Sequence, residues 1–158
     1  TMARVRSQLP DVAWRTTFIV GFPTETDQDF EELVDFVSEG HFQHLGIFLY
    51  SDEDNIRSSK FGDPIPLSLK EERKNRLMEI QQKISREHHQ KMVGSLQQVL
   101  VGGFSSETDL LLEGRNQYQG PEVDGVVYIN EGNATSAGFH QVEITEAHEY
   151  DLVGKILN

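Results

Sequence analysis

The chain has 158 residues, of which 37% are hydrophobic, and its formal net charge at pH 7 is −12. It contains no cysteine, which excludes disulfides and any thiolate-bound zinc ion or iron–sulfur cluster within the chain. No run of about 18 apolar residues is present, and the N-terminal "TMARVRSQLPDV" lacks the apolar segment of a signal peptide. We therefore expect a cytoplasmic protein that does not enter a membrane.

Residues 16–20, Thr-Thr-Phe-Ile-Val, predict a strand that is buried on both faces, as in a parallel sheet. Gly21 and Pro23 interrupt this strand. Thr26 can cap the helix that follows, whose first turn is acidic and so complements the helix dipole. Gly40 is a suitable C-terminal stop. The apolar stripe of this helix is Phe30, Leu33, Val34 and Val37.

A second apolar run, from Leu45 to Tyr50, completes a strand–helix–strand unit of a parallel sheet. Two parallel strands need further neighbours for their faces and edges. The first fifty residues are therefore expected to be part of a larger α/β domain, with "ARVRSQLPDV" as the end of a preceding helix. A small complete α/β domain is the alternative. An open parallel edge makes self-association possible, and the sequence leaves the oligomeric state open.

Residues 51–67 are polar, contain two prolines and predict a loop or linker. Ser68 and Glu71 match the S-x-x-E capping box, so a helix is expected from Ser68 to about Met92. One side of this helix carries Leu77, Ile80, Ile84 and His88.

Basic and histidine side chains on this helix are expected to face solvent. Arg73, Lys74 and Arg76 form a basic patch that neighbouring glutamates can neutralise. His88 and His89 are adjacent, so they point in different directions, and we predict that both lie at the surface without binding a metal.

After Gly94, five short β-prone runs alternate with polar turns, which predicts a small antiparallel barrel. The runs are Leu96–Val101, Leu110–Gly114, Gly125–Asn130, Gln141–Thr145 and Tyr150–Leu157. Five-stranded barrels often bind oligonucleotides, for which aromatic platforms are available here: Phe104, Tyr118, Tyr128, Phe139 and Tyr150. However, residues 91–158 carry ten acids and three bases, and a phosphate backbone needs several cations. This charge favours a basic protein partner and makes nucleic acid an unlikely direct ligand. An acidic surface that serves only solubility is the alternative.

One short segment is a candidate ligand site. Ligands of parallel α/β sheets and barrels sit at the carboxyl ends of the strands, where Gly21–Glu25 is expected. Gly21 allows close approach to the backbone, Pro23 fixes the turn, and Ile19 offers an apolar shelf for a flat base. An ordinary strand-to-helix turn explains the same spacing. No catalytic or metal-binding residue is predicted.

Four segments together resemble the C-terminal part of the methylthiotransferases. They are "RTTFIVGFPTETDQDFEELVDFV", "FLYS", "KEERKNRLMEIQQKIS" and "GR…PEVDGVVYIN…VEITEAHEYDLVG". The members of this family are radical S-adenosylmethionine enzymes that end in a TRAM domain. The resemblance covers essentially the whole chain and implies an α/β plus all-β fold. Its parts are a partial radical-SAM (β/α) barrel over residues 1–67, a linker helix over 68–93 and a five-stranded TRAM or OB-like barrel over 94–158.

Two branches of this family compete. One modifies an adenosine in transfer RNA, and the other, the RimO type, adds a methylthio group to the β-carbon of an aspartate in small-subunit ribosomal protein S-twelve. "DGVVYIN" and "EYDLVGKI" are similar to the RimO ending, and the acidic tail suits a basic ribosomal protein. The expected function is thus of the RimO type, with the TRAM domain docking the protein substrate. The transfer-RNA branch and a non-catalytic protein-binding adaptor are the alternatives.

The resemblance also implies cofactors. S-adenosylmethionine would serve as methyl donor and radical source, and the full-length enzyme would hold two 4Fe–4S clusters. This chain lacks the cysteine ligands, so alone it is expected to be inactive. Ile19 would contact the adenine and Glu25 would fix the bend. The full implied cofactor-binding set is Ile19, Gly21, Phe22, Pro23, Glu25 and Tyr50.

Docking of the basic substrate is assigned by charge and strand position to four acids of the tail: Glu122, Asp124, Glu143 and Asp151. Two departures from the family pattern bear on the cofactor site. Thr24 stands where the family usually has glycine, and "YSDEDNIRSSKF" replaces its usual loop after the second strand.

Overall fold

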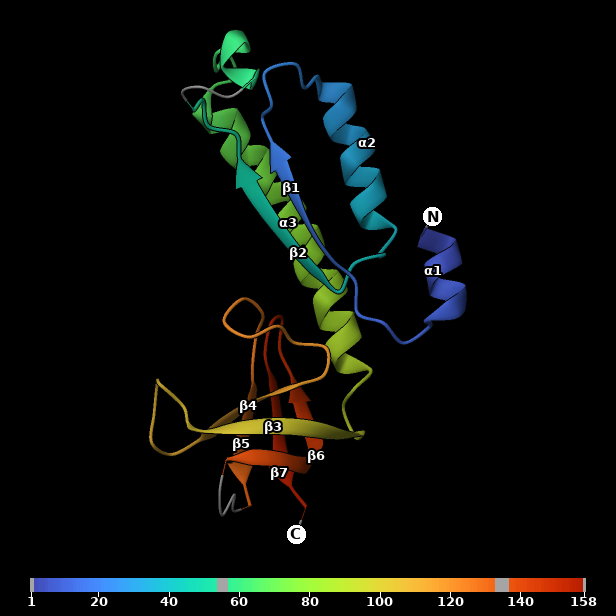
Figure 1. Cartoon of the computed structure of the whole chain (residues 1–158), viewed down its shortest axis with the longest axis vertical. Helices are drawn as coiled ribbons and strands as arrows, with labels where there is room; N and C mark the ends of the chain where they lie inside the picture. The colour runs from blue at the N-terminus through green and yellow to red at the C-terminus, as the bar shows by residue number, and fades with distance from the viewer. Residues whose placement is uncertain (1, 54–56, 133–136, 158) are drawn as a thin grey trace. The chain divides into compact units, whose positions relative to one another are not determined.

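The computed structural model describes residues 2–53, 57–132 and 137–157 (Figure 1). Contacts divide the chain into two units. One is an α/β unit over Ala13–Ile84, and the other comprises the residues up to Val12 together with those from Ser85 onward. Across the described ranges, no helix combines the length and apolarity needed to cross a membrane.

The α/β unit contains the predicted strand–helix–strand arrangement. Its elements are β1 (Arg15–Val20), α2 (Asp27–Ser38), β2 (His44–Leu49), η1 (Arg57–Phe61) and the part of α3 (Leu67–Gln90) up to Ile84. The two strands pair in parallel, with Phe18 opposite Ile47. Gly40 follows the last turn of α2 with a φ of 71°, as its predicted stop position requires.

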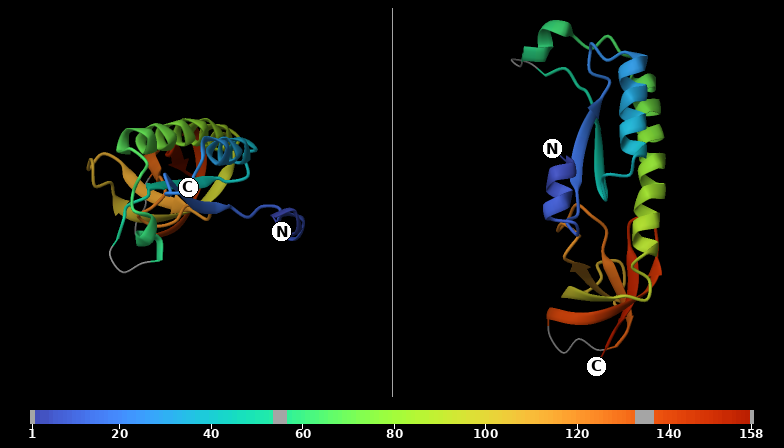
Figure 2. Two further views of the ribbon diagram at one scale, coloured as in Figure 1. Left: turned by 90° about the horizontal axis from the view of Figure 1, so that it is seen from above. Right: turned by 90° about the vertical axis from the view of Figure 1, so that its right-hand side faces the viewer.

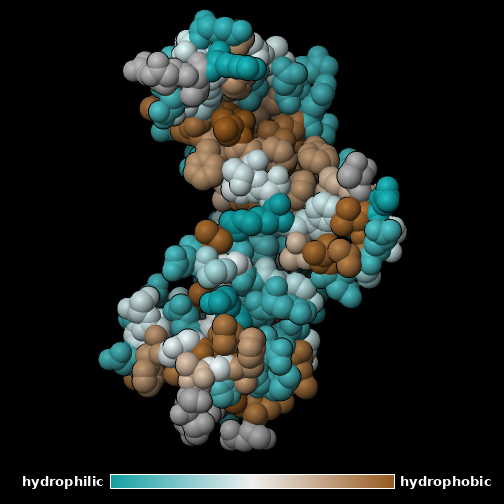
Figure 3. Space-filling view, viewed as in Figure 1, coloured by the Kyte–Doolittle hydropathy of each residue, from teal (hydrophilic) through white to brown (hydrophobic). Residues whose placement is uncertain are grey.

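Helices α2 and α3 lie on the same side of the two strands (Figure 2). The apolar core between them consists of Val20, Phe30, Val34, Val37, Leu45, Ile47 and Leu77. The other face of the strands is open: Ile19 is 58% exposed and its register partner Phe48 is 63% exposed. Apolar side chains gather over this face in Figure 3. The prediction that the first strand is buried on both sides is therefore wrong for this chain, because its described residues provide only one covering layer.

Helix α3 begins one residue earlier than predicted, at Leu67. The carbonyl of Pro66 accepts the first helical hydrogen bonds, from the amides of Leu69 and Lys70 at 3.0 and 3.2 Å. Ser68 therefore lies inside the first turn, and its predicted capping-box role is wrong. Residues 54–56 of the predicted loop lie outside the described residues.

The second unit begins with α1 (Met2–Gln8), where the sequence predicted the end of a helix. The part of α3 after Ile84 also belongs to this unit. The three-part division at residues 67 and 93 remains a prediction.

Five strands form a closed barrel, and each lies where the sequence predicted one. They are β3 (Leu96–Phe104), β4 (Leu112–Asn116), β5 (Val127–Glu131), β6 (Gly138–Ala147) and β7 (Leu152–Ile156). Their order is β3-β4-β5-β7-β6, with β5 and β7 parallel, so the barrel is mixed and the antiparallel prediction needs correction. The reason is topological: the chain passes through β6 before it returns as β7 beside β5. The barrel core is Val99, Val101, Val127, Ile129, Val142, Ile144, Leu152 and Ile156.

Candidate functional site

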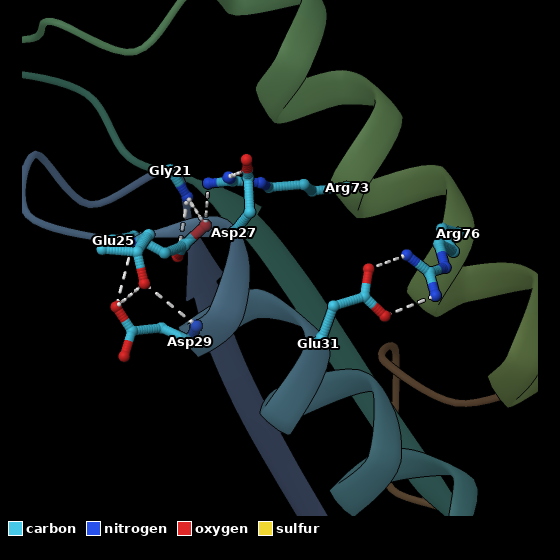
Figure 4. Close-up of polar contacts among 8 residues, drawn as sticks. Gly21, Glu25, Asp27, Asp29, Glu31, Arg73 and Arg76 are labelled. Carbon is cyan, nitrogen blue, oxygen red and sulfur yellow. Dashed lines mark hydrogen bonds and ion pairs between the residues drawn. The ribbon is translucent and has the colours of Figure 1, made fainter.

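The turn that follows β1 is held by one carboxylate (Figure 4). Gly21 is buried and has a φ of 78°, a left-handed conformation that glycine adopts without strain. Its amide donates to both carboxylate oxygens of Glu25, at 3.0 and 3.1 Å. The amide of Glu25 in turn donates to the carbonyl of Phe22 at 2.8 Å. Glu25 thus fixes the bend between strand and helix, as the resemblance implied.

The predicted cap at Thr26 starts α2 immediately after this turn. The Thr26 hydroxyl accepts from the amide of Asp29 at 3.1 Å, and the Asp29 carboxylate accepts from the Thr26 amide at 2.9 Å. Hydrogen bonds from the Thr26 side chain and then from its amide lower the pKa of Asp29. The reciprocal pair is a capping box with aspartate in the third position.

The apolar candidates of the site differ in exposure. Ile19 and Phe22 are exposed, Pro23 is half-buried and Tyr50 is buried. Tyr50 lies directly beyond β2, where its amide donates to the carbonyl of Val20 at 2.9 Å. Its ring meets that of Phe22 edge-on, with centroids 5.3 Å apart. The structure therefore brings Phe22 and Tyr50 together at the carboxyl ends of the two strands, while Ile19 faces the open side of the sheet.

The hydroxyl of Tyr50 is buried and has no hydrogen-bond partner among the described residues. A buried polar group without a partner costs free energy, so such a group needs an explanation. Because Tyr50 directly follows a parallel strand, at the end of the sheet where ligands of such sheets bind, its hydroxyl is a candidate ligand contact.

Two cations of α3 lie at this site: Arg73, which was predicted on a solvated face, and Lys70, for which the sequence predicted no role. Lys70 donates through Nζ to the carbonyl of Tyr50 at 2.8 Å and also to Asp63. Arg73 donates to Glu25 and, at 2.6 Å, to Asp27. Both cations are buried, so the prediction of a solvated face is wrong for Arg73.

A signal in the sequence could have found them. Lys70 and Arg73 precede the buried Leu77 by seven and four residues, which puts all three on one face of the helix. By contrast, Arg76 pairs with the exposed carboxylate of Glu31. A hydrogen bond from Arg76 lowers the pKa of Glu31, and the same bond raises that of Arg76.

His89 also departs from its prediction. It is 6% exposed, and its Nδ1 lies 3.0 Å from the carbonyl oxygen of His148, to which it can donate. The surface assignment is wrong for His89 because the end of α3 packs against the turn that joins β6 to β7. His88 is half-buried, and burial, followed by the nearby Lys91, lowers its pKa.

The four acids assigned to substrate docking have different surroundings. Asp124 accepts from the amide of Gly120 at 2.7 Å, and Asp151 accepts from the amide of Val126 at 2.9 Å. Glu143 pairs with Lys155 at 3.3 Å. Glu122 is exposed. Three of these four acids therefore have hydrogen-bond or ion-pair partners within their own unit.

The aromatic side chains that were considered as platforms for bases differ in their exposure. Phe104, Phe139 and Tyr150 are exposed, whereas Tyr118 and Tyr128 are half-buried. Burial raises the pKa of Tyr128, and the neighbouring acids Glu107, Asp151 and Glu113 raise it further.

The site residues can be compared with the two cofactors that the resemblance implies. An exposed apolar Ile19 beside a glycine turn fits contact with a flat adenine, and the unpartnered Tyr50 hydroxyl leaves a polar group for a ligand. A 4Fe–4S cluster does not fit this chain, which has no cysteine. In the part of the chain that the structure describes, no three His, Cys, Asp or Glu side chains are grouped for a metal.

Gly21 is predicted to resist substitution more than another left-handed glycine of the same unit. A Cβ at Gly21 would lie 2.4 Å from Cγ of the buried Lys70, while a Cβ at Gly40 meets no described atom within 4 Å. Gly40→Ala should cost about 1 kcal/mol from backbone strain alone, and Gly21→Ala about 2–3 kcal/mol with the added overpacking. Urea unfolding followed by the fluorescence of Trp14, the only tryptophan, measures this unit. Equal losses of unfolding free energy in the two variants would contradict the close packing of Lys70 against Gly21.

Comparison with known proteins agrees with the resemblance. Residues 93–157 match the family model described as "TRAM domain". Three curated relatives are named "Ribosomal protein uS12 methylthiotransferase RimO". They come from Anaeromyxobacter sp. (strain K), Desulfotalea psychrophila and Bdellovibrio bacteriovorus and are 48%, 46% and 48% identical over 99%, 98% and 99% of this chain. The chain spans only 33%, 35% and 34% of their respective lengths. It thus carries a TRAM domain and is, over nearly all of its length, a sequence relative of the RimO methylthiotransferases.

Proposed function

We propose that this chain is the C-terminal part of a RimO-type methylthiotransferase, which adds a methylthio group to the β-carbon of an aspartate in uS12. The observation that carries the proposal is 41–48% identity over 98–99% of the chain to proteins named for that activity. In the net reaction, one hydrogen on the β-carbon is replaced by a methylthio group. The reaction would take place in the cytoplasm.

Within that enzyme, the α/β unit would supply part of the radical-SAM barrel. Its open sheet face, with Ile19 and Phe48 exposed, is suited to being covered by further barrel elements. S-adenosylmethionine would bind at the carboxyl ends of β1 and β2, with the adenine against Ile19 and the backbone of Gly21–Pro23 beside it. The cysteine ligands of both 4Fe–4S clusters would come from other parts of the enzyme, and this chain alone would be inactive.

The TRAM domain would dock uS12 through its acidic surface. Residues 91–158 have ten acids against three bases, a balance that attracts a basic polypeptide and repels a phosphate backbone. Because Asp124, Glu143 and Asp151 have partners within the barrel, Glu122 is the docking residue that can be tested without breaking a barrel contact.

Binding measurements with the immobilised chain test the substrate. We expect binding to purified uS12 that weakens with salt, and no comparable binding to transfer RNA. Glu122→Lys should weaken uS12 binding about tenfold, because it places like charges together. Glu79→Lys, an equal charge change on an exposed residue of the other unit, is the matched control and should have little effect. Tight, salt-sensitive binding to transfer RNA with no affinity for uS12 would favour the transfer-RNA branch instead.

A further inference from the structure

Two cations of α3 are buried against the strand ends of the α/β unit. Lys70 is 2% exposed and Arg73 is 3% exposed, and they lie one helical turn apart. Burial of a charge is costly unless its partners and hydrogen bonds compensate. The contacts of these two side chains therefore indicate what part of the fold they serve.

Arg73 acts on the turn after β1 through a carboxylate. Its Nη1 donates to Glu25, and its Nη2 donates to Asp27. The same Glu25 carboxylate accepts the amide of Gly21, so guanidinium, carboxylate and backbone amide form one continuous series (Figure 4). Glu25 therefore connects Arg73 on α3 to the backbone amide of Gly21.

Lys70 acts on the same turn and on the end of β2. Its aliphatic stem occupies the side of Gly21 where a Cβ would lie, and its Nζ donates to the carbonyl of Tyr50 at 2.8 Å. Lys70 thereby joins the residue after β1 to the residue after β2. Its Nζ also lies over the Tyr50 ring, 5.4 Å from the centroid.

We propose that Lys70 and Arg73 are positioning residues, which hold the Gly21–Pro23 backbone and Tyr50 in the orientation that binds S-adenosylmethionine. The inference rests on the proposed function, which places that ligand at these strand ends. It makes ligand affinity depend on α3, an element that contributes no residue to the ligand contacts proposed above. A purely stabilising role predicts the same contacts, so the test must separate affinity from stability.

The test uses a chimera in which this chain replaces the matching third of the Anaeromyxobacter relative, and equilibrium dialysis with S-adenosylmethionine. Arg73→Gln should weaken binding about tenfold, since small misplacements at a ligand site are costly. Arg73→Lys keeps the charge and should restore part of the affinity. The control is Arg76→Gln, which removes a cation paired with the exposed Glu31 and should leave affinity unchanged.

A second readout follows the Gly21 amide directly by NMR of the ¹⁵N-glycine-labelled chain. The chemical shift of this amide should change in both Arg73 variants and remain unchanged in Arg76→Gln. Folded Arg73 variants that bind S-adenosylmethionine as tightly as the parent would overturn the inference. If Arg73→Gln does not fold, the affinity of Arg73→Lys is the deciding measurement. An unsubstituted chimera that has no affinity for S-adenosylmethionine would instead count against the proposed function, and the inference would fall with it.

Discussion

Replacing Arg73 by alanine is expected to lower the free energy of unfolding of the α/β unit by about 3–5 kcal/mol. The Arg73 side chain is 4% exposed and its partner Glu25 is 11% exposed. Without the guanidinium, the Glu25 carboxylate would remain buried without its counter-ion. Arg73 also lies over the Phe30 ring, 5.2 Å from its centroid, but Arg76 makes a similar contact at 5.5 Å, so the buried carboxylate is what sets Arg73 apart. Most of the expected loss is the penalty of an unpaired charge rather than the net stability of the intact pair.

Arg76→Ala is the matched control for this prediction. It removes the same side chain from the same helix, but its partner Glu31 is 54% exposed and stays hydrated. Because surface ion pairs contribute little, the control should unfold close to the parent. Urea unfolding followed by Trp14 fluorescence gives both values. Equal losses in the two variants would show that Arg73 is not the buried support that the structure describes.

The second large effect is expected in the barrel, where Gly154→Ala should cost about 3 kcal/mol through overpacking. Gly154 is buried in β7, opposite Ile129 on β5 and Ile144 on β6. An added Cβ would lie 2.5 Å from Cγ1 of Val142 and 2.7 Å from the carbonyl oxygen of Glu143. Since one of these atoms belongs to the backbone of a paired strand, the barrel would have to open locally to admit it.

Gly102→Ala provides the control, because its nearest contact, the carbonyl oxygen of Glu113, is 3.9 Å away. The only tryptophan lies in the other unit, so amide hydrogen exchange across β6 and β7 is the suitable measurement. Exchange should accelerate strongly in Gly154→Ala and little in Gly102→Ala. Unchanged protection in Gly154→Ala would contradict the close approach of β6 and β7.

The sequence predicted the elements well where local pattern decides them. The helical stripe at Phe30, Val34 and Val37 and the five β-prone runs of the barrel all appear in the structure. The predictions were wrong where the strand arrangement depends on pairing between segments that are distant in the sequence. The parallel β5–β7 pair is one example, because strand order is set by how the whole barrel closes and not by any single run.

The site shows the same division. The glycine turn is local, so Gly21 could be predicted from the sequence pattern, whereas the role of Glu25 in the bend came from the family resemblance. The roles of Lys70, Arg73 and His89 could not, because a charged residue on a helix is usually solvated and its burial depends on partners far away in sequence. In each case the partner lies in a distant connecting segment. Tyr50 follows β2, Glu25 precedes α2 and His148 lies between β6 and β7.

Whether this chain completes a RimO-type methylthiotransferase can be tested with the chimera of the Anaeromyxobacter relative. It would be loaded with iron and sulfide, incubated with S-adenosylmethionine, a reductant and uS12, and the substrate analysed by peptide mass spectrometry beside the intact relative. We expect one aspartate of uS12 to gain a methylthio group in place of one hydrogen. A chimera that loads its clusters and binds S-adenosylmethionine as the relative does, yet leaves uS12 unmodified while the relative modifies it, would show that this chain does not belong to an enzyme with that substrate.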